Sequence, residues 1–192
     1  IPEINIWCPH TIVERNAIPS VIFNIEQKTF CANASAIQLE ATPAGGTFSG
    51  PGVTGAMFDP AVAGIGTHSL SYSFTSETGC SNTATNEVVV NALPTAQISG
   101  GGIVCGASDP AEVSVALTGS APFTITYSDG SSETTVENIN TTTYAFTTLD
   151  AGTYSLLSVS DANTCVGTVS GEAIVNVISG EIDLEILSEG PA

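Results

Sequence analysis

An all-β protein of two tandem β-sandwich domains, with extra strands at both ends, is the fold class that this sequence predicts. Short segments with apolar residues at every second position recur along the chain, as half-buried strands require. Clusters of Gly, Pro, Asn and Asp separate these segments, and no stretch has the periodicity of an amphipathic helix. The length of 192 residues is enough for two small domains.

Residues 1–27 are predicted to form two strands that lie outside both domains. The prolines at positions 2, 9 and 19 make a helix unfavourable here. Apolar side chains alternate with polar ones on each side of a turn near Cys8. We expect these strands to pair with a neighbouring chain or domain through Ile4, Ile6, Trp7, Val21, Phe23 and Ile25.

Residues 28–92 are predicted to form the first domain. A short strand covers 36–41, and the glycine-rich block AGGTFSGPGVTG supplies turns with positive φ. The clearest strand of the protein is 67–75, where His68, Leu70, Tyr72 and Phe74 alternate with Ser and Thr. A strand over 88–90 completes the domain before Leu93 and Pro94.

Residues 93–178 are predicted to form the second domain. Its turns carry GGG, SDG, AG and SDAN sequences, and no helical pattern interrupts them. About seven short strands with regular turns are typical of an immunoglobulin-type sandwich. The strands expected here are 96–99, 112–117, 123–127, 143–147, 153–159 and 173–177.

The tail, residues 179–192, is predicted to form one amphipathic strand. Its apolar face carries Ile182, Leu184 and Ile186, and its other face carries three acidic residues. Such a strand exposes an apolar stripe unless another strand or domain covers it. Its alternation of apolar and polar residues resembles that of IPEINIW at the other end and of LPTAQIS at the boundary between the domains, which indicates a repeat unit.

Charge excludes one class of partner. Two Lys and Arg residues against 19 Asp and Glu give a formal net charge of −17, so phosphates of nucleic acid and anionic lipid surfaces repel the chain. No apolar run approaches the ~18 residues of a membrane span. A polar surface of this kind suits a secreted protein, although simple solubility explains it equally well. The first residue is Ile1, which we interpret as the start of a mature form or of a fragment.

The sequence resembles a known family of repeats over about 150 residues. The segment FCANASAIQLEATPAGGTFSGPGVTGAMFDPAVAGIGTHSLSYSFTSETGCSNTATNEVVVNALP is similar to the PKD-like and Ig-like repeats of very large secreted Bacteroidetes surface proteins. The second domain resembles the companion repeat that often follows. The resemblance implies a role in adhesins, in gliding-associated filaments, or as spacers beside enzymes exported by type IX secretion.

The five cysteines predict disulfide bonds and an oxidising compartment, because no C-x-x-C pair or nearby His suggests zinc. Cys31 and Cys80 frame the first domain, and Cys105 and Cys165 frame the second. Disulfides closing such loops would each contribute about 4 kcal/mol to stability. Free buried thiols are the alternative. Cys8 is left over, as a free thiol, as the partner of a missing segment, or as an intermolecular link.

No catalytic constellation is recognisable. The two histidines, His10 and His68, do not form a plausible dyad with a nucleophile, and His68 is expected to make a structural hydrogen bond. Motifs for serine hydrolases, zinc peptidases and nucleotide binding are absent. Asp129 and Asp161 are expected to cap their own turns. No metal ligands or cofactors are predicted, with weak calcium binding at a turn as the one alternative.

The sequence therefore predicts a non-enzymatic extracellular structural repeat, secreted or attached to the cell surface. It would act as a subunit or fragment of a filament or adhesin and assemble through its terminal strands. The expected partner is a second copy or a neighbouring repeat, with surface glycans as a further candidate. The alternative is a glycan-binding or spacer module of a secreted multidomain enzyme, which the low aromatic content, 6%, does not favour.

Overall fold

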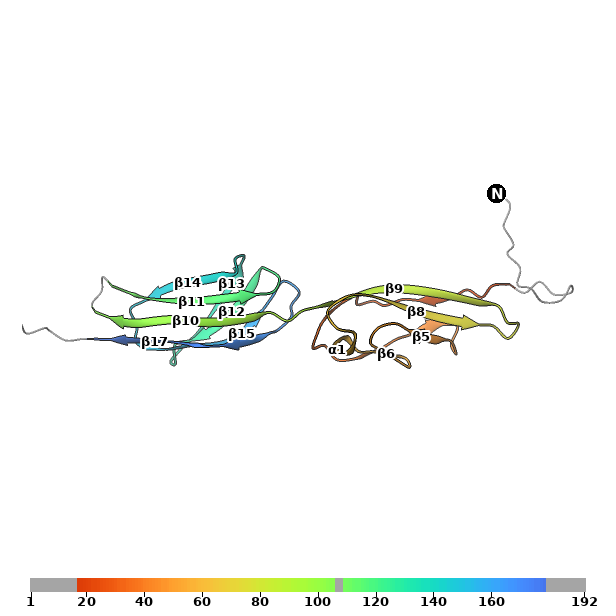
Figure 1. Cartoon of the computed structure of the whole chain (residues 1–192), viewed down its shortest axis with the longest axis horizontal. Helices are drawn as coiled ribbons and strands as arrows, with labels where there is room; N and C mark the ends of the chain where they lie inside the picture. The colour runs from red at the N-terminus through yellow and green to blue at the C-terminus, as the bar shows by residue number, and fades with distance from the viewer. Residues whose placement is uncertain (1–16, 106–108, 179–192) are drawn as a thin grey trace, which may run out of the picture. The chain divides into compact units, whose positions relative to one another are not determined.

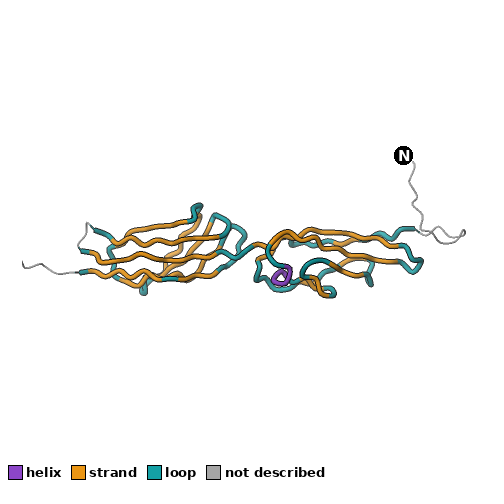
Figure 2. The backbone as a smooth tube through the Cα atoms, viewed as in Figure 1, coloured by secondary structure: helices purple, strands orange, loops and turns teal. Residues whose placement is uncertain are grey.

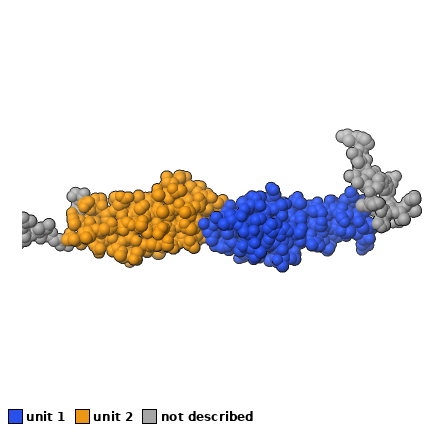
Figure 3. Space-filling view, viewed as in Figure 1, with its two compact units in different colours: residues 1–93 blue, residues 94–192 orange. Residues whose placement is uncertain are grey.

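The computed structural model describes residues 17–105 and 109–178. The chain divides into two compact units, residues 1–93 and 94–192 (Figure 3). The boundary lies one residue from the position expected from the Leu-Pro pair. The predicted terminal strands at 1–16 and 179–192 lie outside the described residues.

Unit 1 consists of short strands around one long hairpin (Figure 1). The hairpin joins β8 (Gly66–Thr75) to β9 (Ser81–Asn91), which pair along their whole length. In their sheet the order is β2-β9-β8-β5. Two smaller sheets, β3-β7-β6 and β1-β4, complete the unit. The remaining strands are β1 (Ile22–Phe23), β2 (Thr29–Cys31), β3 (Ile37–Gln38), β4 (Ala41–Thr42), β5 (Thr47–Ser49), β6 (Val53–Thr54) and β7 (Met57–Phe58).

The strand predicted at 67–75 is confirmed as β8, and its alternation explains why it forms. Leu70 and Tyr72 are buried, whereas Thr67, Ser69 and Ser73 are exposed. One face of β8 therefore packs on the core of unit 1 while the other carries hydroxyl groups into solvent.

One helical turn, α1 (Pro60–Ala63), was not expected from the sequence (Figure 2). The Asp59 carboxylate accepts a hydrogen bond from the Ala61 amide, and a proline occupies the first turn. Gly64, with φ of 81°, ends the helix. These are the ordinary start and stop signals of a helix, so the DPAVAG sequence carried the information despite its brevity.

Unit 2 is a two-layered β-sandwich whose layers share the long strand β10 (Thr95–Val104). The first half of β10 pairs with β11, and its second half pairs in parallel with β17. The sheet order is β13-β12-β15-β17-β10-β11-β14, with β16 beside β10. The other strands are β11 (Ala111–Thr118), β12 (Phe123–Ser128), β13 (Glu133–Ile139), β14 (Thr143–Thr148), β15 (Gly152–Ser160), β16 (Thr168–Ser170) and β17 (Glu172–Val177).

Glycines make the change of layer in β10 sterically feasible. Gly100, Gly101 and Gly102 all have positive φ. A Cβ on Gly100 would lie 2.4 Å from the Glu112 carbonyl oxygen, and one on Gly101 would lie 2.3 Å from that of Ile174. Only glycine tolerates this backbone approach from both neighbouring strands.

Each unit has its own hydrophobic core. In unit 1 the core gathers Phe23, Ile25, Phe30, Leu39, Phe58, Leu70, Tyr72, Val88 and Val90. In unit 2 its fully buried members include Ile98, Val113, Val115, Phe123, Ile125 and Val159.

The first core corrects one expectation. Val21, Phe23 and Ile25 were expected in a separate strand that pairs with a neighbour. Instead Phe23 and Ile25 are buried in the core of unit 1, and Val21 packs against it. Residues 17–27 therefore belong to the first unit, because their alternating apolar face is needed to fill its interior.

Candidate interaction surfaces

An open groove of about 780 Å³ lies in unit 1. Its deepest side chains are Leu39 and Tyr72, which are buried, and Phe48, which is partly buried. Ile22, 56% exposed, lies at the rim and is available for contact. Small residues form most of the remaining wall, and the one charged residue that lines the groove is Glu40. The wall residues are Asn24, Ala41, Thr42, Ala44, Gly45, Gly46, Thr47, Gly55 and Ala56.

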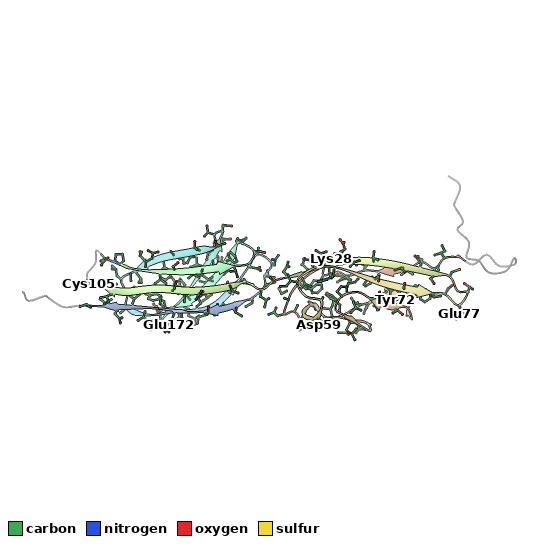
Figure 4. The ribbon with its side chains drawn as sticks, viewed as in Figure 1. Lys28, Asp59, Tyr72, Glu77, Cys105 and Glu172 are labelled. Atoms are coloured by element: carbon green, nitrogen blue, oxygen red, sulfur yellow. The ribbon has the colours of Figure 1, made fainter. Side chains whose placement is uncertain are left out.

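The Tyr72 hydroxyl fixes the wall of this groove (labelled in Figure 4). It donates a hydrogen bond to the Pro43 carbonyl oxygen at 2.5 Å and accepts one from the Gly46 amide at 2.6 Å. Because Tyr72 lies on β8, these bonds tie the turn between β4 and β5 to the central hairpin. Tyr72 also packs on Phe48, whose ring centroid is 4.6 Å away.

Several strands that the structure describes end a sheet. In unit 1, β4 pairs only with β1, and β5 pairs only with β8. In unit 2, the terminal strands are β13 and β14. Each therefore has one backbone edge without a strand beside it among the described residues, and such edges are templates for pairing with another chain.

A face covered with hydroxyl groups spans β5, β8 and β9. Cross-strand hydrogen bonds join Ser49 to Ser71 at 2.8 Å, Ser73 to Thr83 at 2.6 Å and Thr75 to Ser81 at 2.8 Å. Such pairs stabilise the sheet. They also leave this face polar and nearly uncharged, as the sequence predicted for the outer face of the strand at 67–75.

Four aromatic side chains of unit 2 pack together, although the sequence showed no aromatic cluster. Tyr127 stacks on Phe146 with ring centroids 4.9 Å apart, and Tyr144 and Tyr154 also contact Phe146. Burial raises the pKa of the Tyr127 hydroxyl above its ordinary value, against a smaller lowering from its hydrogen bond with Thr134. Alternation within β12 and β14 contained this signal, but only the pairing of sheets brings the rings together.

Both turn aspartates have the local role expected. Asp129 accepts hydrogen bonds from the amides of Ser131 and Ser132, each at 2.7 Å, which hold the pKa of its carboxyl below the ordinary value. Asp161 is 6% exposed and accepts bonds from the amides of Asn163 and Cys165. In the part of the chain that the structure describes, no three His, Cys, Asp or Glu side chains gather so as to hold a metal ion.

The cysteine pairs expected from the sequence are wrong. Cys31 pairs in register with Asn91 at one end of β9, whereas Cys80 directly precedes the other end. This strand of 11 residues spans roughly 30 Å, and bonded cysteines need Cα atoms within about 7 Å. Cys31 and Cys80 are each disulfide-bonded, but not to each other.

Strand length also separates the second expected pair. Cys105 follows the last residue of β10 (Figure 4), whereas Cys165 lies near the first, since Thr168 donates to the Pro94 carbonyl oxygen. Cys105 is an exposed free cysteine, and Cys165 is disulfide-bonded. The prediction of disulfide bonds is therefore right for three cysteines and wrong in pairing. Cys8 lies outside the described residues.

The other predicted residues have the following places. His68 makes a hydrogen bond of 2.8 Å between its Nε2 atom and the Gly64 carbonyl oxygen, which confirms its structural role. Within residues 17–105 and 109–178, no helix reaches the length and apolar content needed to cross a membrane. Six residues expected to mediate assembly lie outside those ranges: Ile4, Ile6, Trp7, Ile182, Leu184 and Ile186.

Comparison with known proteins supports the fold. Residues 93–174 match a family described as the Ig-like domain of the nucleoporin POM152. This match covers the described strands of unit 2 almost completely. A comparison with curated proteins gives no match.

Solved structures with several Ig domains are more distant. The N-terminal four Ig domains of Dscam1 isoform 9.44 are 14% identical to this chain, with a TM-score of 0.36. Those of isoform 4.44 are also 14% identical, with a TM-score of 0.40. Each match covers 88% of this chain and 48% of the other, so the chain spans about half the length of these proteins. At this similarity they support no argument about function.

The predicted all-β, Ig-like fold is confirmed by the sandwich sheets and the family match. No finding bears on the more specific resemblance to PKD-like repeats of Bacteroidetes.

Proposed function

We propose that this chain is a non-enzymatic structural repeat of an extracellular filament or adhesin, and that it assembles by strand pairing with a second copy or a neighbouring repeat. The observation that carries the proposal is the set of one-sided strands β4, β5, β13 and β14. A free edge offers unpaired backbone donors and acceptors, which an added strand satisfies without a specialised site.

An extracellular location agrees with the covalent chemistry of the chain. Three cysteines are disulfide-bonded, and disulfides persist mainly in oxidising compartments. The resemblance to repeats of secreted surface proteins points the same way, and it is the source of the filament and adhesin assignment.

The terminal segments are the proposed donors. Ile182, Leu184 and Ile186 alternate with acidic residues in the tail, and Ile4, Ile6 and Trp7 lie in the other terminal segment. Either segment would be stabilised by burying its apolar side chains against another sheet.

Deletion of residues 180–192 tests the proposal. We expect the full chain to form oligomers or filaments in electron microscopy and multi-angle light scattering, and the shortened chain to stay monomeric. Circular dichroism should show that both chains are folded equally. Undiminished assembly of the shortened chain would show that the tail is not the donor.

A second candidate is a glycan-binding or spacer module beside an enzyme domain. The cluster of Tyr127, Tyr144, Phe146 and Tyr154 favours it, because aromatic side chains are useful in binding sites. The rings pack mainly on one another and on the core, however, which leaves little ring surface for a sugar. Retardation of the monomer in glycan-containing native gels, lost on Tyr144→Ala, would support this candidate over the first.

A further inference from the structure

The groove of unit 1 lies between two strand edges. Its lining includes Ala41 and Thr42 of β4, Thr47 and Phe48 of β5, and residues 44–46 between them. β4 pairs with β1, and β5 pairs with β8. No described strand joins β4 to β5, so each keeps one backbone edge without a partner strand among the described residues.

The lining suits an extended backbone more than a compact small molecule. The Ala and Gly residues of the wall carry little or no side chain to cover their main chain. Leu39 and Tyr72 lie almost fully buried beneath this wall, so Phe48 and Ile22 supply the accessible apolar side chains of the groove. A ligand that matches the wall and these apolar side chains is an extended strand, which can pair through its backbone and carries apolar side chains on one face only.

We propose that this groove is the acceptor for the strand Ile182–Leu187 of a second copy. The inference rests on the proposed function, and it adds where the donated strand binds. Ile182, Leu184 and Ile186 would enter the groove, and the main chain would pair with β4 and β5. Asp183 and Glu185 would face solvent, away from Glu40.

The tail fits the groove better than the N-terminal segment does. Residues 181–186 contain three apolar side chains in strict alternation and no proline. The other segment has only Ile4 and Ile6 in alternation and is bracketed by Pro2 and Pro9, and proline removes a donor from a strand.

A peptide of residues 180–190, added to the chain that lacks residues 180–192, tests the site directly. We expect saturable binding by fluorescence anisotropy, and slower hydrogen exchange at the amides of β4 and β5. Ala44→Trp places a bulky side chain at the groove wall and should weaken binding at least tenfold. Ala61→Trp is the matched control, since Ala61 is also exposed but does not line the groove. Should Ala44→Trp fail to fold, Ala56→Trp, at another residue that lines the groove, replaces it.

The peptide carries its own control. Leu184→Asp puts a charge on the apolar face and should also reduce binding at least tenfold, whereas Glu185→Gln should not. Equal binding to the Ala44→Trp and Ala61→Trp proteins, or no slowing of exchange in β4 and β5, would overturn the proposed site.

The full chain distinguishes this inference from the proposed function. If it assembles, and the Ala44→Trp chain assembles equally well, strand assembly stands and the groove is not its acceptor. If the full chain stays monomeric while the peptide still protects β4 and β5, the groove accepts the strand but the filament role fails. In a third outcome, the full chain is a monomer whose β4 and β5 amides already exchange slowly, and this protection is lost when residues 180–192 are removed. The chain's own tail would then occupy the groove, which would overturn the proposal that a second copy supplies the strand.

Discussion

The hydroxyl of Tyr72 shows how much of unit 1 depends on a single polar atom. The ring is only 2% exposed, and its oxygen bonds both Pro43 and Gly46. The alternation of β8 predicted that the ring is buried. It gave no indication of the two bonds, because the turn that supplies them is 26 and 29 residues away in the sequence.

We expect Tyr72→Phe to destabilise unit 1 by about 1–3 kcal/mol, because the Pro43 carbonyl and the Gly46 amide each lose a partner in a partly buried place. Scanning calorimetry of the full chain measures this as a lower transition temperature. Tyr144→Phe is the comparison, since Tyr144 is partly exposed and has no corresponding pair of bonds; its effect should stay within about 0.5 kcal/mol. Equal effects of the two substitutions would show that the hydrogen bonds of the Tyr72 hydroxyl do not stabilise unit 1.

Strands with apolar alternation were predictable from the sequence, and strands without it were not. The segments at 67–75, 112–117 and 153–159 were found because their buried faces are uniformly apolar. By contrast, β13 and the first half of β9 are rich in Thr, Asn and Glu and were missed. Most of β13 is exposed at the edge of its sheet, so hydrophobic patterning does not select its sequence.

The groove of unit 1 was not predictable from local sequence patterns. The glycine-rich block was correctly expected to form turns, but the groove beside it depends on which strands those turns leave unpaired. Pairing is a long-range property, as the cysteines show. The position of two cysteines at the ends of each domain suggested a disulfide bond between them. The lengths of β9 and β10 exclude both bonds, because each strand separates the two cysteines of its pair. Sequence patterns therefore identified elements well and their neighbours poorly.

The glycines of β10 allow a sharp test at the level of one strand. Gly101→Ala would place a Cβ 2.3 Å from the Ile174 carbonyl oxygen, whereas at Gly102 no atom lies within 4 Å. Both positions have positive φ, so both substitutions pay roughly 1–2 kcal/mol in backbone conformation. Gly101→Ala should cost clearly more, because the β10–β17 pairing must open. Urea unfolding of the two variants measures the difference, and similar midpoints would show that the close approach is not needed.

The charge of the whole molecule opposes both folding and assembly. With 2 cationic residues against 19 carboxylates, at most a small share of the acidic groups can be paired. The remainder repel one another within a chain and between chains. The acidic face of the proposed donor strand adds to that repulsion. Association of two copies therefore requires enough salt to shorten the range of the electrostatic repulsion between them.

We therefore expect sodium chloride to stabilise this protein. Raising the ionic strength from 0.01 M to 0.15 M shortens the screening length from about 30 Å to about 8 Å. The unfolded chain is expanded and suffers less repulsion than the folded units, so screening favours the folded state. A gain of about 1 kcal/mol would raise the melting temperature of a domain of this size by roughly 4–8 °C. Near pH 4, where carboxyl groups are about half protonated, the same addition of salt should have a much smaller effect. A melting temperature that does not respond to salt at pH 7, or responds equally at both pH values, would mean that the hydroxyl-rich surface disperses the carboxylates widely enough to make their repulsion unimportant.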